Sequence, residues 1–281
     1  MSSSKKRNSL LCPNCRRLVS RSAPVCPACG LKNPGSIWKD NIFTRSVGRE
    51  DGILRVILVA NIAMFVLSVA IDLRPTVLSS SPFNFLSPSN NSLLVLGSTG
   101  TIPLFQFNRW WSLISASYLH GSLLHIAFNM IALHQLGPLI LREYGASRMI
   151  AIYTLSGIGG YIVSALFGVR FTIGASAAVC GLIGAALYYG KSRGGAYGKA
   201  IYSQIGGWAV GIFIFGFMVP GINNWGHAGG MLSGALAGYI LGYQERSREN
   251  IGHKFLSTIC IVCTGLTLLW SIANGVFFVL S

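Results

Sequence analysis

The chain contains few charged residues, and acidic ones are the scarcest. Only 10% of its 281 residues are charged, against about 25% in an average soluble protein, and 52% are hydrophobic. Seven residues are acidic, and none of them lies inside an apolar run. Transporters that couple to protons or cations usually place carboxylates within their membrane spans, so this absence argues against a transporter or channel. The composition indicates a protein embedded in a lipid bilayer.

A secretory signal sequence is also missing from the first residues. Residues 1–8 are polar and basic, and cysteine pairs follow where the apolar region of a signal peptide would lie. We therefore expect no cleavable leader. The net charge of +15 is of the kind that nucleic-acid-binding proteins carry, but the distribution of the basic residues suggests another cause.

Long uncharged runs make up most of the chain after residue 52. About 20 apolar residues cross a bilayer core, and only helices or closed barrels satisfy the backbone there. We expect an all-α polytopic membrane protein. Its seven predicted helices are 53–71, 118–141, 149–169, 171–189, 201–220, 225–243 and 255–279. The connection 72–117 is rich in proline and aromatic residues, which predicts a loop that partly re-enters or lies on the membrane; the alternative is a solvent loop whose aromatics pack on the helices.

The basic residues alternate in density between successive loops. If the N-terminus is cytoplasmic, the inner segments hold 19 Lys and Arg residues and the outer segments hold three, which are Arg74, Arg109 and Arg170. The positive-inside rule then predicts a cytoplasmic N-terminus and an outer C-terminus, in a cell inner or plasma membrane. Because topology explains the basic excess, we expect no nucleic-acid partner.

Four of the seven cysteines lie near the N-terminus. Cys12, Cys15, Cys26 and Cys29 form two Cys-x-x-Cys pairs with ten residues between them. Four thiolates can complete a tetrahedral shell around Zn²⁺, and the spacing favours this over two redox or disulfide motifs. A reducing cytoplasm also favours metal over disulfides. We expect a small four-cysteine zinc ribbon that depends on structural Zn for much of its folding energy, with an unknown partner.

Four polar residues from three predicted helices fall at a similar depth near the outer ends. Ser176 and His227 lie near the starts of the fourth and sixth helices, and His125 and Asn129 lie in the first turns of the second. A neutral histidine can take the proton of a serine hydroxyl near pH 7, so Ser176 and His227 are a candidate dyad. His125 and Asn129 share a helix face and can donate to an oxyanion, although such a pair is also typical of an interhelical clamp.

Glycine recurs about every four residues in the sixth predicted helix, from Gly226 to Gly242. The fourth helix offers a small face around Gly181, so the two helices can approach closely and bring His227 against Ser176. The alternative is a plain small-residue interface that carries an incidental serine and histidine. With no acid inside the spans to orient the histidine, the sequence permits a dyad rather than a triad.

Three motifs resemble the rhomboid family of intramembrane serine proteases. They are Gly174-Ala175-Ser176, the His125…Asn129 spacing, and the run from Gly226 to Gly230, and the resemblance covers roughly residues 53–245. The run from Tyr118 to Asn129 and the residues Glu143, Gly145 and Arg148 are also similar to that family. The resemblance implies that Ser176 is the nucleophile and His227 the general base. It also implies an oxyanion hole lined by His125, Asn129 and the Ser176 backbone N–H.

The resemblance further implies a rhomboid-like six-helix core plus a seventh C-terminal helix, preceded by the ribbon. The expected domains are a cytoplasmic zinc-ribbon segment and linker (1–50), a protease core (51–245), and a cytoplasmic loop with the seventh helix (246–281). The implied activity is a serine endopeptidase that needs no catalytic cofactor and cleaves transmembrane helices of substrate proteins near the outer leaflet. The alternative is an inactive rhomboid-like protein that binds membrane helices. Its main support is that Ala177 replaces the usual glycine and could crowd the oxyanion region, and that Cys180 replaces an aromatic.

Overall fold

The computed structural model describes residues 9–12, 17–35, 52–71 and 85–280. The chain divides into two compact units, Met1–Ile57 and Leu58–Ser281, and each is described by itself. The boundary falls within helix α2 (Gly52–Ile71). The division into domains 1–50, 51–245 and 246–281 stays a prediction.

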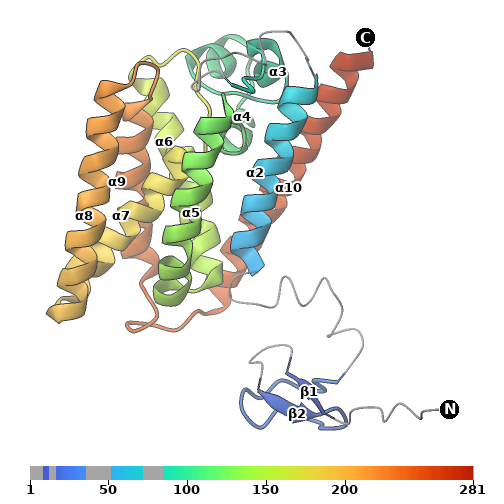
Figure 1. The fold of residues 1–281 in the computed structure, drawn as a ribbon, viewed down its shortest axis with the longest axis vertical. Coiled ribbons are helices and arrows are strands. Elements are labelled where there is room, and N and C mark those ends of the chain that lie inside the picture. Colours follow the sequence, from blue (N-terminus) through green and yellow to red (C-terminus); the bar gives the residue numbers. More distant parts are fainter. Residues whose placement is uncertain (1–8, 13–16, 36–51, 72–84, 281) are drawn as a thin grey trace. The chain divides into compact units, whose positions relative to one another are not determined.

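The N-terminal unit is built on a two-stranded antiparallel sheet (Figure 1). Strand β1 (Ser9–Leu11) pairs with β2 (Leu18–Ser20), with Leu10 opposite Val19. The buried residues beside the sheet are Cys12, Val19 and Cys26. So small a core removes little apolar surface from water, which leaves the unit dependent on other sources of stability.

Helices dominate the second unit, as the prediction of an all-α polytopic fold requires (Figure 1). After α2 the long helices are α5 (Leu123–Tyr144), α6 (Ala146–Leu166), α7 (Ser176–Arg193), α8 (Gly195–Met218), α9 (Asn224–Leu241) and α10 (Ile251–Leu280). Five of them, α2, α5, α6, α8 and α10, are long and apolar enough to cross a membrane. Helices α7 and α9 have 18 residues each and are glycine-rich. They do not reach that hydropathy because glycine and polar residues occupy many of their positions.

Helix α7 is the most enclosed of the described helices and packs against α9, α6, α8 and α5. Its contact with α9 is made between backbones. A methyl group placed on Gly234 would lie 1.9 Å from the Gly181 oxygen, and one placed on Gly184 would lie 1.9 Å from the Met231 oxygen. Only glycine allows this approach, so the predicted close packing of these two helices is confirmed.

Two predicted helices start too early in the sequence, because hydrogen bonds hold their first residues in other conformations. The predicted helix 171–189 begins only at Ser176, because Thr172 pairs with Thr99 through two backbone hydrogen bonds of 2.7 and 3.0 Å. The predicted helix 118–141 begins only at Leu123, because Ser122 is extended and its hydroxyl accepts from the His125 N–H. Hydrogen bonds that compete with helix formation set both boundaries.

The described part of the connection before α5 begins at residue 85. It holds the short helices α3 (Asn90–Val95), η2 (Ile102–Gln106), α4 (Ser112–Ser115) and η3 (Ala116–Tyr118). The side chains of Phe105, Phe107 and Trp110 are half-exposed on it. Residues 72–84 of the predicted loop lie outside the described residues, and its contact with the membrane stays a prediction.

A buried arginine joins the α5–α6 junction to the far end of α9. Arg148 lies in the first turn of α6 and is 0% exposed. Its guanidinium donates to the Gly242 oxygen at 2.8 Å and to the Ser247 oxygen at 2.5 Å. Since these oxygens lie at and just beyond the end of α9, one side chain fixes that end of the helix.

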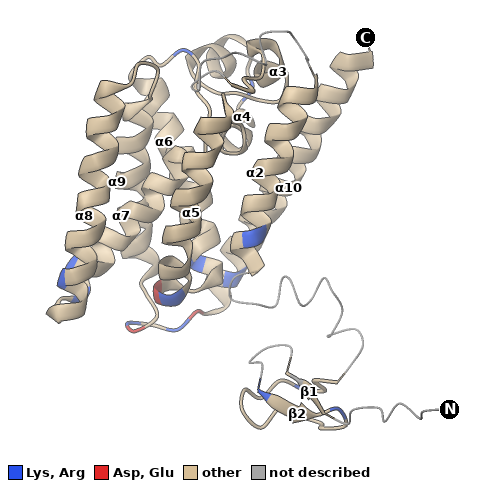
Figure 2. Ribbon diagram, in the orientation of Figure 1, with Lys and Arg blue, Asp and Glu red and all other residues tan. Residues whose placement is uncertain are grey.

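Figure 2 shows that Lys and Arg residues of the helical unit gather mainly at the end of the bundle where α7 finishes and α8 begins. Arg193 is the last residue of α7, and Ser176 is its first. Ser176 therefore lies at the end of its helix that is remote from this basic region.

Candidate active site

Ser176 opens helix α7, and the helix start is left without a side-chain cap. Ala175 holds the N-cap position and makes no side-chain hydrogen bond, while its backbone oxygen accepts from the Val179 N–H at 2.9 Å. The first backbone N–H groups of a helix have no partner inside the helix. They point past Ser176 and favour negative charge there.

The backbone leading to Ser176 is held from several sides. The Gly174 N–H donates to the Ala116 oxygen at 2.9 Å, and the Gly174 oxygen accepts from the buried Tyr161 hydroxyl at 2.5 Å. The Ala175 N–H faces His120 Nε2 at 3.5 Å. Gly174 adopts a φ of 123°, which L side chains rarely reach, so the turn requires glycine. His120 therefore adjoins the backbone of this turn.

His125 faces the turn before Ser176 with its Nε2 atom. Its Nδ1 atom accepts from the Gly121 N–H at 3.3 Å, so in the neutral ring the hydrogen is on Nε2. A methyl group placed on Gly174 would lie 2.8 Å from His125 Nε2 and 3.6 Å from Ser176 Oγ. The imidazole therefore presents a donor next to the serine hydroxyl.

Asn129 lies one turn further along the same face of α5. Its side chain is buried, and its amide nitrogen donates to the His125 oxygen at 3.0 Å. An amide nitrogen carries two hydrogens, so this bond leaves a second donor for a ligand. The spacing of four residues places the two side chains on one helix face, as predicted.

His227 lies in the first turn of α9, about one turn before Gly230. A methyl group placed on Gly230 would lie 2.1 Å from the Ala177 oxygen, so α9 approaches the first turn of α7 closely just after His227. His227 Nδ1 has no hydrogen-bond partner within the described part of the chain, so no carboxylate orients the ring there.

Ser176 Oγ and His227 are not hydrogen-bonded to each other among the described residues. Catalytic hydrogen bonds are often loose without substrate and tighten in the reacting complex, so this separation is compatible with a serine and its base. The structure thus places His125 beside the turn before Ser176, Asn129 one turn beyond His125, and His227 on a helix that packs against α7. The joint role of these four residues stays a prediction.

The methyl group of Ala177 packs against α6. A methyl group placed on Gly160 would lie 2.9 Å from the Ala177 Cβ, and Ala177 forms a buried cluster with Ala116 and Tyr161. Gly160 therefore provides the space that this methyl group needs. The sequence suggested that the Ala177 methyl group could crowd the oxyanion region. In the structure, the close contact of this methyl group is with Gly160 of α6.

Sequence reasoning missed two residues that hold the site. Tyr161 donates to the Gly174 oxygen, a contact between residues of two segments that no local pattern reveals. Asn223 precedes α9, and its Oδ1 accepts from the Gly226 N–H at 2.9 Å. An asparagine immediately before a predicted helix is an N-cap signal, so this second residue could have been found.

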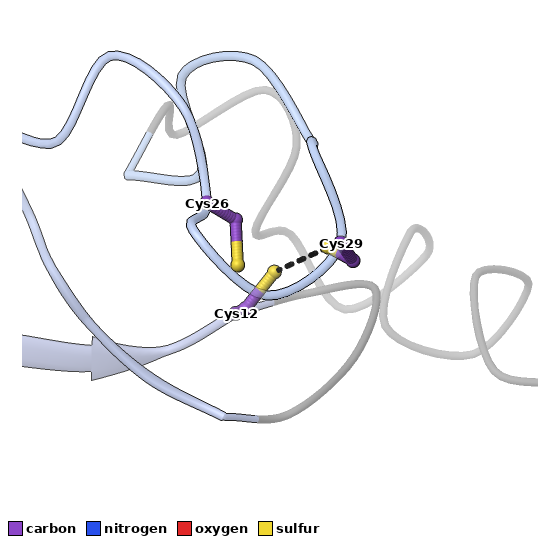
Figure 3. A group of neighbouring side chains, drawn as sticks. All are labelled: Cys12, Cys26 and Cys29. Carbon is purple, nitrogen blue, oxygen red and sulfur yellow. Dashed lines mark hydrogen bonds between the residues drawn. The ribbon is translucent and has the colours of Figure 1, made fainter.

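Three of the four N-terminal cysteines meet in the first unit (Figure 3). The Sγ atoms of Cys12, Cys26 and Cys29 all lie within 4.8 Å of one another, and those of Cys12 and Cys29 are 3.6 Å apart. A disulfide would need about 2.0 Å. A tetrahedron with Zn–S bonds of about 2.3 Å has sulfur atoms about 3.8 Å apart. The geometry fits a metal site, while Cys15 lies outside the described residues.

Comparisons with known proteins point to one family. Residues 108–244, a little under half of the chain, match the family model described as Rhomboid domain. The chain is 34% identical over 187 residues to "Rhomboid protease GluP" of Bacillus subtilis (strain 168), which covers 62% of this chain and 36% of that protein. It is 33% identical over 165 residues to "RHOMBOID-like protein 6, mitochondrial" of Arabidopsis thaliana, which covers 58% of this chain and 54% of that protein.

A further relative matches over more of its length. "Rhomboid-like protease 3" of Toxoplasma gondii is 29% identical over 234 residues, which covers 82% of each chain. The first two relatives are matched over about a third to a half of their own length. Together these similarities support the rhomboid family, and the fold is a rhomboid-type polytopic all-α fold. The matched region contains all four residues of the candidate active site.

Proposed function

We propose that this chain is a rhomboid-family intramembrane serine protease that cleaves transmembrane helices of other proteins through a Ser176–His227 dyad. One observation carries the proposal. Ser176 stands at an uncapped helix start, and His125 of α5 lies against the turn before it. The helix that carries His227 packs backbone to backbone on the first turns of α7. A packing interface explains the glycines but gives no reason for a donor and a base beside one hydroxyl.

The reaction follows from these positions. His227 takes the proton of the Ser176 hydroxyl while Oγ attacks the carbonyl carbon of the scissile peptide bond. The protonated imidazole then gives that proton to the leaving amine as the C–N bond breaks. Water, activated by the same histidine, hydrolyses the resulting ester and frees Ser176. No metal or organic cofactor is required.

The tetrahedral intermediate carries a negative oxygen, and the proposal assigns three groups to stabilise it. They are the Ser176 backbone N–H at the start of α7, His125 Nε2–H and the Asn129 amide. Loss of one oxyanion donor typically lowers kcat by about 10²–10³-fold. We expect His125→Ala and Asn129→Ala to fall in that range. His134→Ala, which changes an exposed histidine of the same helix, is the matched control.

The proposed substrates are single transmembrane helices that unwind locally at the site. Ser176 lies at the end of α7 remote from the basic region, and basic loops stay on the cytoplasmic side. We therefore place cleavage near the outer leaflet, with the N-terminus in the cytoplasm. Protease protection of tags at the two termini in sealed vesicles tests this orientation: opposite protection of the two tags supports it, and equal protection contradicts it.

Labelling with a fluorophosphonate, followed by cleavage of a transmembrane reporter, tests the activity. Wild type should label and cleave, and Ser176→Ala and His227→Ala should do neither. Ser192→Ala removes an exposed serine from the far end of α7 and should behave as wild type. Equal behaviour of wild type and Ser176→Ala in both assays would refute the protease. Capture of the reporter without cleavage would identify the helix-binding alternative.

We also propose that the cluster of Cys12, Cys26 and Cys29, together with Cys15, binds one structural Zn²⁺. The 3.6 Å separation of two sulfur atoms supports this, as does the small core around them. In addition, Cys26 shares two backbone hydrogen bonds with the following turn, at Gly30 and Leu31, which is the tight form a two-cysteine metal knuckle needs. The ion would hold the segments together and take no part in proteolysis.

Metal analysis of the purified full-length protein tests the zinc proposal. Wild type should contain about one Zn per chain, and Cys12→Ser should lose most of it. Cys263→Ser changes an exposed cysteine of α10 and should keep the metal. A wild-type protein with no zinc and with four reactive N-terminal thiols would contradict the proposal. Since the metal is structural, Cys12→Ser should leave fluorophosphonate labelling of Ser176 intact.

A further inference from the structure

One side chain, Asn223, connects three segments that surround the candidate active site. Its amide nitrogen donates to Ser164 Oγ at 2.6 Å, near the end of α6, and to Thr172 Oγ1 at 2.9 Å, in the segment that leads to Ser176. Its Oδ1 accepts from the Gly226 N–H at 2.9 Å, in the first turn of α9. Both hydrogens of the amide thus reach other segments, while its oxygen caps the helix that follows Asn223.

The same residue is linked to both members of the dyad through the backbone. Asn223 O accepts from the His227 N–H at 3.1 Å, so the two belong to one helical turn. Thr172 lies four residues before Ser176 and is fixed in turn by its backbone pairing with Thr99. A shift of Asn223 would therefore change the position of α9 relative to the segment that carries the nucleophile.

Helix capping alone does not explain an asparagine here. The cap uses only Oδ1, and serine or aspartate caps a helix about as well. What these residues lack is the pair of amide hydrogens that reach Ser164 and Thr172. Neither acceptor belongs to α9, so both bonds act between segments and not within the capped helix.

We infer that Asn223 is a positioning residue that sets the approach of His227 to Ser176 by tying the start of α9 to Thr172 and Ser164. The inference rests on the proposed protease function. A displacement of about 1 Å between reacting groups can cost about 100-fold in rate. The loss of these two bonds should therefore lower the rate of the chemical step much more than it lowers the binding of substrate.

Asn223→Ser tests the inference, because serine keeps the cap and loses both amide hydrogens. We expect the maximal rate of fluorophosphonate labelling to fall about tenfold or more, with the half-saturating concentration of the probe unchanged. Ser164→Ala and Thr172→Val each remove one acceptor and should give smaller losses. When either change is combined with Asn223→Ser, the labelling rate should not fall below that of Asn223→Ser alone. The effects of two substitutions that break the same interaction do not add.

Asn250→Ser is the matched control. Asn250 Oδ1 accepts from the His253 N–H at 3.1 Å at the start of α10, so it is the same residue type in the same capping role in another helix. This variant should label as wild type does. Equal maximal rates for Asn223→Ser and Asn250→Ser would overturn the inference, as would a change in half-saturation alone.

Hydrogen exchange separates a failure of this inference from a failure of the proposed function. In Asn223→Ser, amides of residues 170–176 and 223–228 should exchange faster together, and Asn250→Ser should affect neither segment. Unchanged exchange in residues 170–176 overturns the inference, whatever the activity. If the wild type does not label although exchange in both segments responds to Asn223→Ser, the protease proposal fails while the linkage between the segments is upheld.

Discussion

Helices α8 and α9 both pack against α7, both are rich in glycine, and they are held very differently. Along α9, methyl groups placed on Gly230 or Gly234 would lie 2.1 and 1.9 Å from backbone oxygens of α7. Along α8, methyl groups placed on Gly206, Gly207 or Gly211 would meet nothing within 4 Å. The same residue type therefore permits backbone contact along α9 and leaves open space along the middle of α8. Near the ends of α8, methyl groups on Gly198 and Gly216 would meet Gly190 and Asn224.

The ends of the two helices are held by different contacts. At the start of α8, the Tyr197 hydroxyl donates to the Glu143 carboxylate of α5 at 2.7 Å. Asn223 ties the start of α9 to α6 and to the segment before Ser176, and Arg148 holds its far end. On α8, the ring of Phe215 meets that of Phe128 of α5, with centroids 6.0 Å apart. The comparison shows that the helix carrying the base is fixed along its length and at both ends. Precise placement of His227 needs this rigidity.

The largest effect is expected from Arg148→Met, which releases the far end of α9. The variant loses two charged hydrogen bonds to backbone oxygens, each of which contributes about 1.5–3 kcal/mol. The free energy of unfolding should therefore fall by about 3 kcal/mol or more. Thermal denaturation in detergent measures this. Arg193→Met is the control, since Arg193 pairs at 2.8 Å with Glu245, whose side chain is 51% exposed. A surface pair contributes about 0–1 kcal/mol. Equal melting temperatures for the two variants would contradict the comparison.

The next effect is expected from Gly234→Ala, which forces α7 and α9 apart. The new methyl group meets the backbone of Gly181, which cannot move as a side chain can. Overpacking of this kind costs about 1–3 kcal/mol, and displacement of His227 should also lower the labelling rate. Thermal denaturation and fluorophosphonate labelling are measured on the same sample. A Gly234→Ala protein as stable and as reactive as wild type would show that the two helices separate more easily than their packing indicates.

Much of this arrangement is predictable from the sequence. Uncharged runs predicted all seven long helices of the described chain, and the glycine spacing predicted the close contact of α7 with α9. The His125 and Asn129 pair follows from helical periodicity. In contrast, the start of α7 could not be predicted, because it depends on the pairing of Thr172 with Thr99, a residue far away in the sequence.

Hydrogen bonds between distant segments could not be predicted from the sequence for the same reason. Tyr161 and Asn223 reach the site across helices, and periodicity describes only one helix at a time. The sequence also could not distinguish the glycines of α8 from those of α9, since the distinction depends on what lies opposite each one. The helices and their faces could be predicted from local sequence patterns. The hydrogen bonds that join separate helices could be seen only in the structure.

A smaller effect is expected where α6 meets the first turn of α7. Gly160→Ala places a methyl group 2.9 Å from the Ala177 Cβ and 2.7 Å from the Gly226 backbone oxygen, and should cost about 1 kcal/mol of stability or more. Ala177→Gly removes the opposing methyl group. The double variant should therefore regain part of the loss, which a double-mutant cycle of melting temperatures measures. Strictly additive losses would show that the two positions do not share this space.

The smallest effect, and of opposite sign, is expected from Gly207→Ala in α8. No atom lies within 4 Å of the new methyl group, so helix propensity decides the outcome. Alanine in a helix interior is favoured over glycine by about 0.5–1 kcal/mol, mainly because the unfolded chain loses freedom. The melting temperature should rise slightly, with labelling unchanged. A clear loss of stability would mean that this face of α8 packs against a second copy or another protein. Gly206, Gly207 and Gly211 of α8 would then make close contacts with another chain, as the glycines of α9 do with α7. The two helices would differ only in what their glycines contact.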